Sequence, residues 1–391
     1  MDISILVLGA QGAGKTVYLA GLYQQLSIAN IDNVVTLETR ERYARRLFNT
    51  YLHLLDVSRE FPPPTPWGVE SVSFNCVLTN RHGSFPLFKA TYHDYTGEML
   101  DPRHIPEDED DEQLQRVNRL IDTADVFIVL IDGLKMLRLL QGDPLMALWL
   151  DQYLPFVLRH LAKPGPQGLR PVHFVVTKWD LLDGEFTLEE VREKLLAQHF
   201  MPGFLEHRRE HDNSPVRLIP VSVTGPFARL SESGVIEKVP GQSISPCNVE
   251  VPFVAILPDM IRAALKETRS LEPSWDSARE ARLAQQAGFL DQSRQLLEGP
   301  VGRLVDRIMG QTGLATRTTY AGARAWLEDL IERRRKAVGR ELEHLHREHQ
   351  RKQRDVETRE AALELALESF EARLHSFEEK YPASLLIGGG L

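Results

Sequence analysis

The stretch LGAQGAGKTV, residues 8–17, decides the fold. It follows the apolar run DISILVL (residues 2–8), which predicts a buried strand, and it opens the segment Lys15–Ala29, which predicts a helix. Its glycines allow consecutive backbone N–H groups to point inward and form a nest for an anion. The helix start adds its partial positive charge. The spacing Gly-x-x-x-x-Gly-Lys-Thr in this context predicts a phosphate-binding loop.

Each residue type in this loop has an expected role. Lys15 is expected to reach the terminal phosphates of a nucleotide and to stabilise charge as a bond to phosphate breaks, and the Thr16 hydroxyl is expected to bind Mg²⁺. The alternative, a glycine-rich turn without a ligand, leaves the complete motif unexplained. The residues expected around the phosphates are Gly9, Gln11, Gly12, Ala13, Gly14, Lys15, Thr16 and Val17.

Composition limits the classes of function. The chain has 391 residues, a net charge of -9 and a pI of about 5.9, so no overall positive field attracts nucleic acid or an anionic membrane. Its two cysteines, Cys76 and Cys247, have no neighbours with metal-ligand spacing, which makes a disulfide framework or zinc site unlikely and fits the reducing cytoplasm. A helix that spans a bilayer needs an apolar run of about 18 residues or more, and the sequence contains no such run.

Strand and helix signals alternate through the first two thirds of the chain. Apolar runs at 124–132, 171–180 and 216–225 predict buried strands, and residues 69–79 and 85–94 predict an antiparallel hairpin. The alternation predicts an α/β fold with a doubly wound, mostly parallel sheet, followed by an all-α extension. We expect helices at residues 40–57, 145–161, 188–198 and 252–267, and a loop at 231–246.

Composition changes near Ser270, where strand signals end. We expect a domain over residues 1–270, a helical linker over 271–318 and a long helix over 319–391. A helix of about 60 residues would be about 90 Å long. Its last third carries a heptad seam, which predicts a coiled coil that binds a partner helix or a second copy. The seam residues are Val356, Leu363, Leu367, Phe370, Leu374 and Phe377.

The final residues, SLLIGGGL, are apolar. They fit either a loose tail or the first residues of a hydrophobic membrane segment, and a membrane is not otherwise indicated.

Three further motifs follow the phosphate loop. TKWD, residues 177–180, ends a predicted strand, and Asp180 there can accept two hydrogen bonds from the N1–H and amine of guanine, a donor pair that adenine lacks. Thr177 opens the motif, and the Lys178 stem is expected to lie along the base. DYTG, residues 94–97, places Asp94 to hold Mg²⁺ through water and the Gly97 N–H to meet a γ-phosphate. Backbone amides of Ser222 and Val223 are expected near the guanine O6.

Four motifs in this order resemble the translation-factor-related class of P-loop GTPases, whose core is like that of Ras and Rho proteins. The resemblance covers about residues 1–265. The insert before FPPPT and the DYTGE motif resemble, more narrowly, the bacterial double-GTPase domains of multi-gene conflict systems. The resemblance implies binding of GTP or GDP with Mg²⁺, hydrolysis of GTP, and a cytoplasmic switch protein.

The chain departs from that pattern at the switch residues. The candidate switch threonine, a further Mg²⁺ ligand, is Thr65, with Thr36 and Thr39 as rivals. Glu98 stands where Ras-like proteins place a water-orienting glutamine, and it orients water or caps a helix start. Gln11 replaces a small glycine and has the bulk to exclude an arginine supplied in trans. Both departures point to slow hydrolysis.

Two other functions stay open. One is a GTP-binding scaffold with negligible hydrolysis that assembles partners through its coiled coil. The other is an ATPase, against which Asp180 argues. Among the remaining residues, we expect Asp132 to cap a helix and His93 to be structural.

Overall fold

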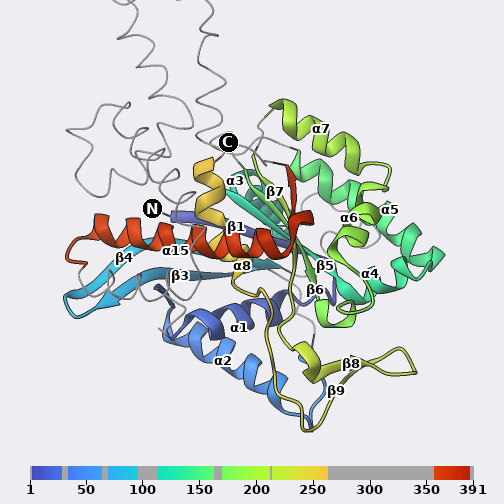
Figure 1. Cartoon of the computed structure of the whole chain (residues 1–391), viewed down its shortest axis with the longest axis horizontal. Helices are drawn as coiled ribbons and strands as arrows, with labels where there is room; N and C mark the ends of the chain where they lie inside the picture. The colour runs from blue at the N-terminus through green and yellow to red at the C-terminus, as the bar shows by residue number, and fades with distance from the viewer. Residues whose placement is uncertain are drawn as a thin grey trace, which may run out of the picture.

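The computed structural model describes residues 2–28, 34–63, 69–95, 112–162, 170–211, 214–262 and 356–387. These residues form an eight-stranded sheet with helices on both faces (Figure 1). The strand order is β10-β7-β6-β5-β1-β4-β3-β2. The α/β fold expected from the alternating strand and helix signals is therefore confirmed.

The centre of the sheet consists of parallel strands buried on both faces. In β1, Ile5 and Val7 pack into one core, and Leu6 and Leu8 pack into the other. This period of two places successive residues of the strand in the two apolar layers, which explains the continuous apolar runs in the sequence. The parallel strands are β1 (Asp2–Gly9), β4 (Gly83–Tyr95), β5 (Val126–Asp132), β6 (Val172–Thr177) and β7 (Val216–Pro220).

The predicted hairpin is antiparallel and lies toward one edge of the sheet. β3 (Val69–Asn80) pairs with β4, and a short strand that the sequence did not indicate, β2 (Thr36–Glu38), pairs with β3 at the edge. A second small sheet joins β8 (Ala228–Leu230) to β9 (Ile236–Lys238). Part of the segment expected to be a loop at 231–246 is therefore a strand.

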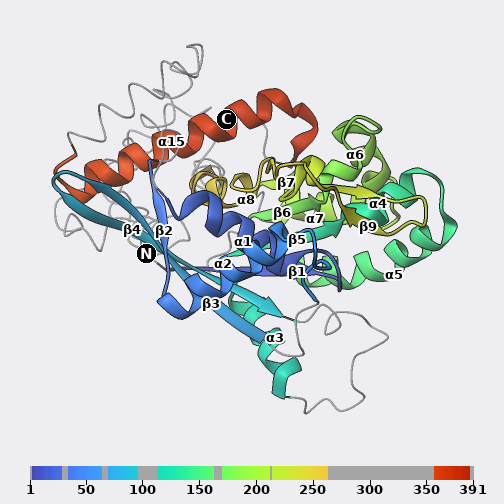
Figure 2. The ribbon, with the colours of Figure 1, turned by 90° about the horizontal axis from the view of Figure 1, so that it is seen from below.

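Helices cover the two faces unequally (Figure 2). One core contains residues of α1 (Lys15–Leu26), α2 (Glu41–Leu55), α8 (Val251–Val254) and α15 (Arg359–Lys380). The opposite core contains residues of α3 (Glu112–Thr123), α4 (Gly133–Leu140), α5 (Pro144–Leu161), α6 (Leu188–Leu196) and α7 (Met201–His211). Three short 3₁₀ helices are η2 (Trp179–Leu181), η3 (Gly225–Phe227) and η6 (Pro382–Ser384). We did not predict α3, α4 and α7.

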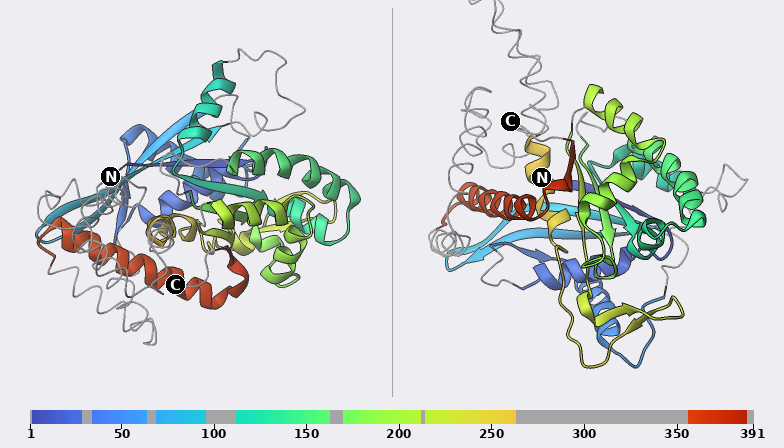
Figure 3. Two further views of the ribbon diagram at one scale, coloured as in Figure 1. Left: turned by 90° about the horizontal axis from the view of Figure 1, so that it is seen from above. Right: turned by 45° about the vertical axis from the view of Figure 1, so that its right-hand side comes forward.

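The predicted coiled-coil seam is buried inside the domain. α15 begins at Arg359, and Thr358 caps it by accepting a hydrogen bond from Ala361 N, so the long helix that we expected beyond residue 319 is interrupted here. The helix lies beside β4 and α8 (Figure 3), and its apolar side chains belong to the core on that face of the sheet. Heptad spacing also suits an amphipathic helix that lies on a sheet, which is why the sequence misled us. The buried seam residues are Val356, Leu363, Leu367, Phe370, Leu374 and Phe377.

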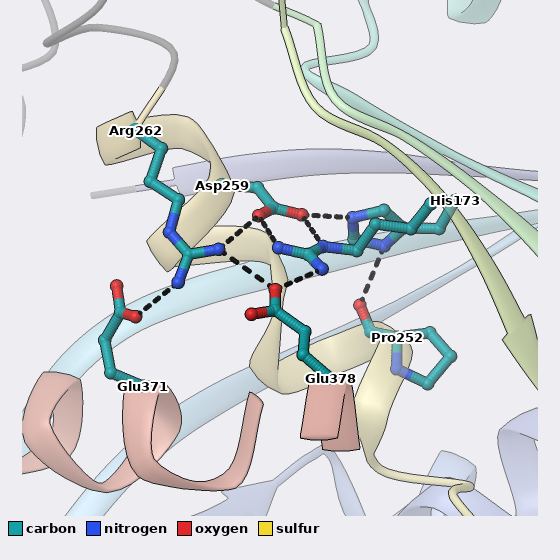
Figure 4. A network of polar contacts seen from close by, with 7 residues as sticks. His173, Pro252, Asp259, Arg262, Glu371 and Glu378 are labelled. Atoms are coloured by element: carbon teal, nitrogen blue, oxygen red, sulfur yellow. Dashed lines mark hydrogen bonds and ion pairs between the residues drawn. The ribbon is translucent and has the colours of Figure 1, made fainter. Parts of the chain in front are cut away.

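An ion-pair network fastens α15 to the domain (Figure 4). Arg217 of β7 donates to Asp259 Oδ2 and Oδ1, each at 2.6 Å, and to Glu378 Oε1 of α15 at 2.7 Å. Arg262 donates to Glu371 Oε2 of α15 at 2.7 Å. His173 lies 3.0 Å from Asp259 Oδ2. Because Arg217 and Asp259 are fully buried, these charges are compensated by one another rather than by water.

The apolar tail contributes a strand to the sheet. β10 (Leu385–Ile387) pairs antiparallel with β7, and Leu386 and Ile387 are buried. Neither a loose tail nor a membrane segment describes these residues, because their apolar side chains pack in the domain. In the part of the chain that the structure describes, no helix has the length and apolar character needed to cross a membrane. The domain boundary near residue 270 and the linker at 271–318 lie outside the described residues and stay predictions.

Candidate functional site

The predicted phosphate loop joins β1 to α1 and has the backbone of an anion nest. Gly12 and Gly14 have positive φ values of 79° and 84°, a conformation that other residues adopt only at a cost. Gly9 lies so close to β5 that an added Cβ would be 3.1 Å from the Cβ of Leu130. Gly14 is the N-cap of α1. Two left-handed glycines and a helix start therefore meet at one place, as an anion site requires.

Lys15 lies folded over its own loop. Its Nζ donates to Gly9 O at 2.7 Å and Ala10 O at 3.4 Å, and the residue is 6% exposed. Backbone carbonyls of the loop thus hold the ammonium group against the loop itself. Thr16 follows on the first turn of α1, and its side chain is partly exposed.

The predicted base motif is tied directly to the phosphate loop. Thr177 Oγ1 lies 2.9 Å from Ala13 O and 3.2 Å from Ile131 O, so a threonine at this position connects β6 with the loop and with β5. Lys178 has a φ of 52°, and its Nζ donates to Asp132 Oδ1 at 2.9 Å. Asp132 also accepts from Leu134 N at 3.0 Å and caps α4. The predicted helix cap is confirmed, and its second role as the partner of Lys178 is new.

Asp180 lies at the start of η2, where a hydroxyl group orients it. Ser222 Oγ donates to Asp180 Oδ1, and Gly225 N donates to Ser222 Oγ at 2.8 Å. Burial raises the pKa of Asp180, and the hydrogen bond from Ser222 and the charge of Lys178 oppose that rise. The Ser222 N–H donates to Cys247 O at 3.0 Å, so this amide is not available for the contact with guanine O6 that we predicted. Ser222 instead positions Asp180 through its side chain.

A cavity of about 730 Å³ brings the two motifs together. Its walls include side chains from the phosphate loop at one end and from the base motif at the other. The predicted residues that line it are Gln11, Gly12, Gly14, Lys15, Thr16, Val17, Thr177, Lys178, Asp180 and Val223. Ala13 and Ser222 lie behind this wall and support it through the contacts above.

The predicted switch residues are only partly described. The pairing of Leu6 with His93 places the backbone of Asp94 at the end of the sheet that carries the phosphate loop. Thr65, Gly97 and Glu98 lie outside the described residues. The rivals of Thr65 are engaged elsewhere: Thr36 Oγ1 donates to Val77 O at 3.4 Å and Thr39 Oγ1 donates to Ser73 O at 2.7 Å, both at the edge of the sheet. His93 is structural, as predicted, because its ring contacts the Ser4 and Ser71 hydroxyls.

A second groove of about 850 Å³ lies beside the cavity and shares Thr16, Pro62 and Pro63 with it. Three of its four arginines have acidic partners, and the fourth, Arg42, donates to the Tyr43 hydroxyl at 2.9 Å. Arg45 pairs with Glu41 at 2.7 Å, Arg46 pairs with Glu70, and Arg59 pairs with Asp56 at 3.0 Å. Apart from Thr16, no residue of the phosphate loop or of the base motif lines this groove, so the smaller cavity is the candidate site.

The remaining walls of the cavity were not predicted. They come from the end of α2 with the segment that follows it, and from the β8–β9 hairpin. Outside α2, the sequence of these segments is rich in Pro, Gly and Ser, a composition that indicated loops. Periodicity gives no signal for such walls, because their position depends on contacts between distant segments. The residues are Leu54, Phe61, Pro62 and Pro63 on one side and Ala228, Gly234, Val235 and Ile236 on the other.

Comparison with known proteins identifies the family. A family model described as Double-GTPase 2 matches residues 3–222, more than half of the chain. The chain belongs to the Double-GTPase 2 family. The predicted P-loop GTPase of the double-GTPase type is thereby confirmed, and membership supports binding of a guanine nucleotide. The matched region holds the phosphate loop, the base motif and Ser222, whereas β8–β9, α8, α15 and β10 lie beyond it.

Solved structures similar to this Double-GTPase 2 protein are also GTPases or GTPase-like. The Arl6 BBS3 small GTPase of Trypanosoma brucei is 14% identical, with 57% of this chain and 87% of that chain covered and a TM-score of 0.27. The Ski7 GTPase-like domain of S. cerevisiae is 14% identical, with 66% and 50% covered and a TM-score of 0.37. The SRb protein of Chaetomium thermophilum is 18% identical, with 57% and 91% covered and a TM-score of 0.30. The comparison with curated proteins gave no match.

Proposed function

We propose that this protein binds GTP with Mg²⁺ in the 730 Å³ cavity, hydrolyses it to GDP and acts as a molecular switch. One observation carries the proposal: the phosphate loop and Asp180 line the same cavity, joined by the bond from Thr177 to Ala13. A ligand that fills both ends needs a phosphate chain and a head with two adjacent donors. Guanosine triphosphate has both.

The phosphate end would work through charge and position. Lys15 would exchange its bonds to Gly9 and Ala10 carbonyls for bonds to phosphate oxygens, and would stabilise the charge that develops as the terminal phosphate leaves. The amides of the loop would add to this stabilisation.

The donors present suit Mg²⁺. Mg²⁺ is usually held by few protein oxygens and by the phosphates of a substrate. Thr16 offers a hydroxyl in the cavity, and Asp94 is the proposed carboxylate behind it. Among the described residues, no group of three His, Cys, Asp or Glu could hold a metal ion, and the phosphates of the nucleotide would supply further oxygens to the proposed Mg²⁺. When bound, it would neutralise charge on the phosphates.

The base end would select guanine. With Ser222 donating to one of its oxygens, Asp180 keeps lone pairs on both oxygens for the N1–H and the amine of guanine. Adenine would offer this half-buried carboxylate no pair of donors, which costs binding free energy.

The test is phosphate release in a single turnover. The protein is loaded with GTP labelled at the γ-phosphate, and Mg²⁺ starts the reaction. We expect phosphate release from the wild type and loss of release in Lys15→Ala. In Thr16→Ala, which lacks the proposed Mg²⁺ ligand, we expect release to need a higher Mg²⁺ concentration. GTP binding without phosphate release would favour the alternative, a GTP-binding scaffold. Gln11 and Glu98, which depart from the Ras-like pattern, are the reason for keeping this alternative.

The proposed readout also needs revision in one respect. Because the seam of α15 is buried in the domain, it is not an exposed surface for a partner helix. Recognition of the nucleotide state by the C-terminal region, self-association and partner binding remain parts of the proposal that only experiments on the whole chain can test.

A further inference from the structure

The β8–β9 hairpin borders the nucleotide cavity and depends on neighbouring segments for its order. Its two strands pair through Ala228 with Lys238 and Leu230 with Ile236. A two-stranded hairpin by itself is marginally stable in water, so its position must be set by contacts outside it. Figure 1 and the right-hand view of Figure 3 show the hairpin beside the end of α2.

Lys238 supplies the main contact to α2. Its ammonium group donates to His53 O at 2.9 Å, Asp56 O at 2.8 Å and Glu60 O at 3.2 Å. An ammonium group has three donors, and here each has a backbone carbonyl. His53 and Asp56 lie at the end of α2, where carbonyls lack helical partners and a positive charge is favourable. Lys238 thus caps α2 from a distant segment and fixes the start of the 56–63 segment.

Both segments that Lys238 joins are walls of the cavity. Phe61 lies on one wall, with its ring centroid 5.3 Å from Lys238 Nζ. Val235 and Ile236 lie on the other wall, and Val235 is 58% exposed, so its apolar surface is available to a ligand in the cavity. A second contact holds the hairpin tip, where Arg138 of α4 donates to Gly234 O at 3.4 Å.

We propose that Lys238 is a positioning residue for the nucleotide: it fastens the β8–β9 hairpin to the segment after α2, so that the two close over the bound guanosine and slow its release. This inference rests on the proposed function. In this proposal the two walls separate when the nucleotide leaves, and that separation breaks the three hydrogen bonds from Lys238. The hairpin lies beyond residue 222, where the family match ends.

The experiment measures nucleotide dissociation from the full chain. Protein loaded with a fluorescent GDP analogue is mixed with excess GDP, and the decay gives the dissociation rate. Lys238→Met keeps the length of the side chain and removes its donors. Because hydrogen bonds to a charged group are among the stronger ones, we expect dissociation to be about tenfold faster. Lys238→Arg restores donors and is expected to recover most of the slow rate.

Two further variants separate positioning from general stability. Glu237→Gln alters an exposed neighbour in β9 that does not line the cavity, and it is expected to leave the rate unchanged. Arg138→Met releases the hairpin tip without touching α2, and it is expected to accelerate dissociation about threefold, as loss of a single weak hydrogen bond would. This variant also tests the proposal if Lys238→Met does not fold.

The outcomes are distinct. Faster dissociation in Lys238→Met and Arg138→Met, with recovery in Lys238→Arg, supports the proposal. A lowered unfolding midpoint with a wild-type dissociation rate would show that Lys238 only caps α2, and equal acceleration in Glu237→Gln would show a nonspecific effect; either result overturns the proposal. Failure of the wild type to bind guanine nucleotide would instead contradict the proposed function.

Discussion

Replacing Arg217 with methionine tests whether buried charges, as well as apolar contacts, attach α15 to the GTPase domain. Arg217 is fully buried and bonds in a bidentate manner to Asp259, with a third bond to Glu378. Methionine keeps most of the apolar stem and removes the charge. The change in the free energy of unfolding therefore reports mainly on the loss of the ion pairs.

The expected magnitude follows from what the variant leaves behind. Breaking a buried ion pair by removing one partner costs about 3–5 kcal/mol, because an uncompensated charge stays buried. Asp259 would keep His173 at 3.0 Å and Arg262 at 4.0 Å, and Glu378 would keep Arg262 at 3.2 Å. With these partners remaining, we expect the lower end of the range, about 3 kcal/mol.

The pH dependence of this loss has a definite sign. Burial raises the pKa of Asp259, but the charge and hydrogen bonds of Arg217, together with those of His173, lower it by more. The net pKa of Asp259 therefore lies well below 3.8. In the wild type, Asp259 contributes stability above pH 3.8 that is lost as the pH falls through its folded pKa. Without Arg217 the effect of burial dominates and the pKa of Asp259 rises. Protonation of Asp259 as the pH falls then removes the uncompensated buried charge from the variant. The difference between wild type and variant should narrow from pH 7 to about pH 4.5.

Urea unfolding followed by circular dichroism at both pH values provides the measurement. Arg229→Met, at an exposed arginine of β8, is the matched control and should change the free energy of unfolding by less than about 0.5 kcal/mol. The double variant Arg217→Met, Asp259→Leu removes both charges and should recover most of the loss. A loss in Arg217→Met below about 1 kcal/mol, as for an exposed pair, or a double variant less stable than the single one, would refute the reasoning.

Three other predictions follow from burial and from the base motif. Asp180→Asn should weaken GTP binding and favour xanthosine triphosphate, because an amide can donate to the 2-carbonyl of xanthine; a competition assay in which GTP keeps its advantage would contradict this. Phe370→Ala should destabilise the protein by about 3–5 kcal/mol, since Phe370 is 2% exposed and its ring packs against Phe253. Light scattering should show the oligomeric state of this variant unchanged. Dissociation of an oligomer would instead restore the coiled-coil interpretation. Cys76 is buried and Cys247 is partly exposed, and burial raises the pKa of both thiols, so a thiol reagent should modify Cys247 slowly and Cys76 only on unfolding; rapid modification of both would count against this core.

The sequence predicted the parts of the site that local chemistry determines. The glycines of the phosphate loop are required by a backbone conformation and a close approach to β5, and such requirements are visible in a short motif. Asp132 was predicted as a cap for the same reason, since helix starts select short acceptors. Asp180 was found through its spacing from that loop.

The parts that depend on distant contacts were not predictable. Ser222 was chosen for its amide, but its hydroxyl orients Asp180, and only the tertiary structure brings the two side chains together. Lys238 lies in a segment with loop composition, and its three acceptors are backbone carbonyls, which have no sequence signature. The heptad seam of α15 was recognised correctly as an apolar stripe, but a stripe does not identify the surface that it covers.

The minimal folding unit extends beyond residue 262, because α15 and β10 pack on the domain. A chain of residues 1–262 would lose α15 and β10. It would expose the edge of β7, leave Arg217 and Arg262 without Glu378 and Glu371, and uncover the apolar core that α15 buries. Unpaired strand edges and exposed apolar patches promote aggregation.

We therefore expect residues 1–262 to bind a hydrophobic dye, aggregate on gel filtration and bind guanine nucleotide poorly, in contrast to the full chain. Adding residues 356–391 as a separate peptide supplies the matched control, because it restores the missing strand and helix without restoring the connection. Recovery with this peptide, and not with one carrying Phe370→Ala, would show that docking of α15 and β10 completes the domain. A monomeric, cooperatively unfolding 1–262 chain with full nucleotide affinity would show instead that this segment is an appendage, because the charges and apolar surface it covers would then tolerate exposure to water.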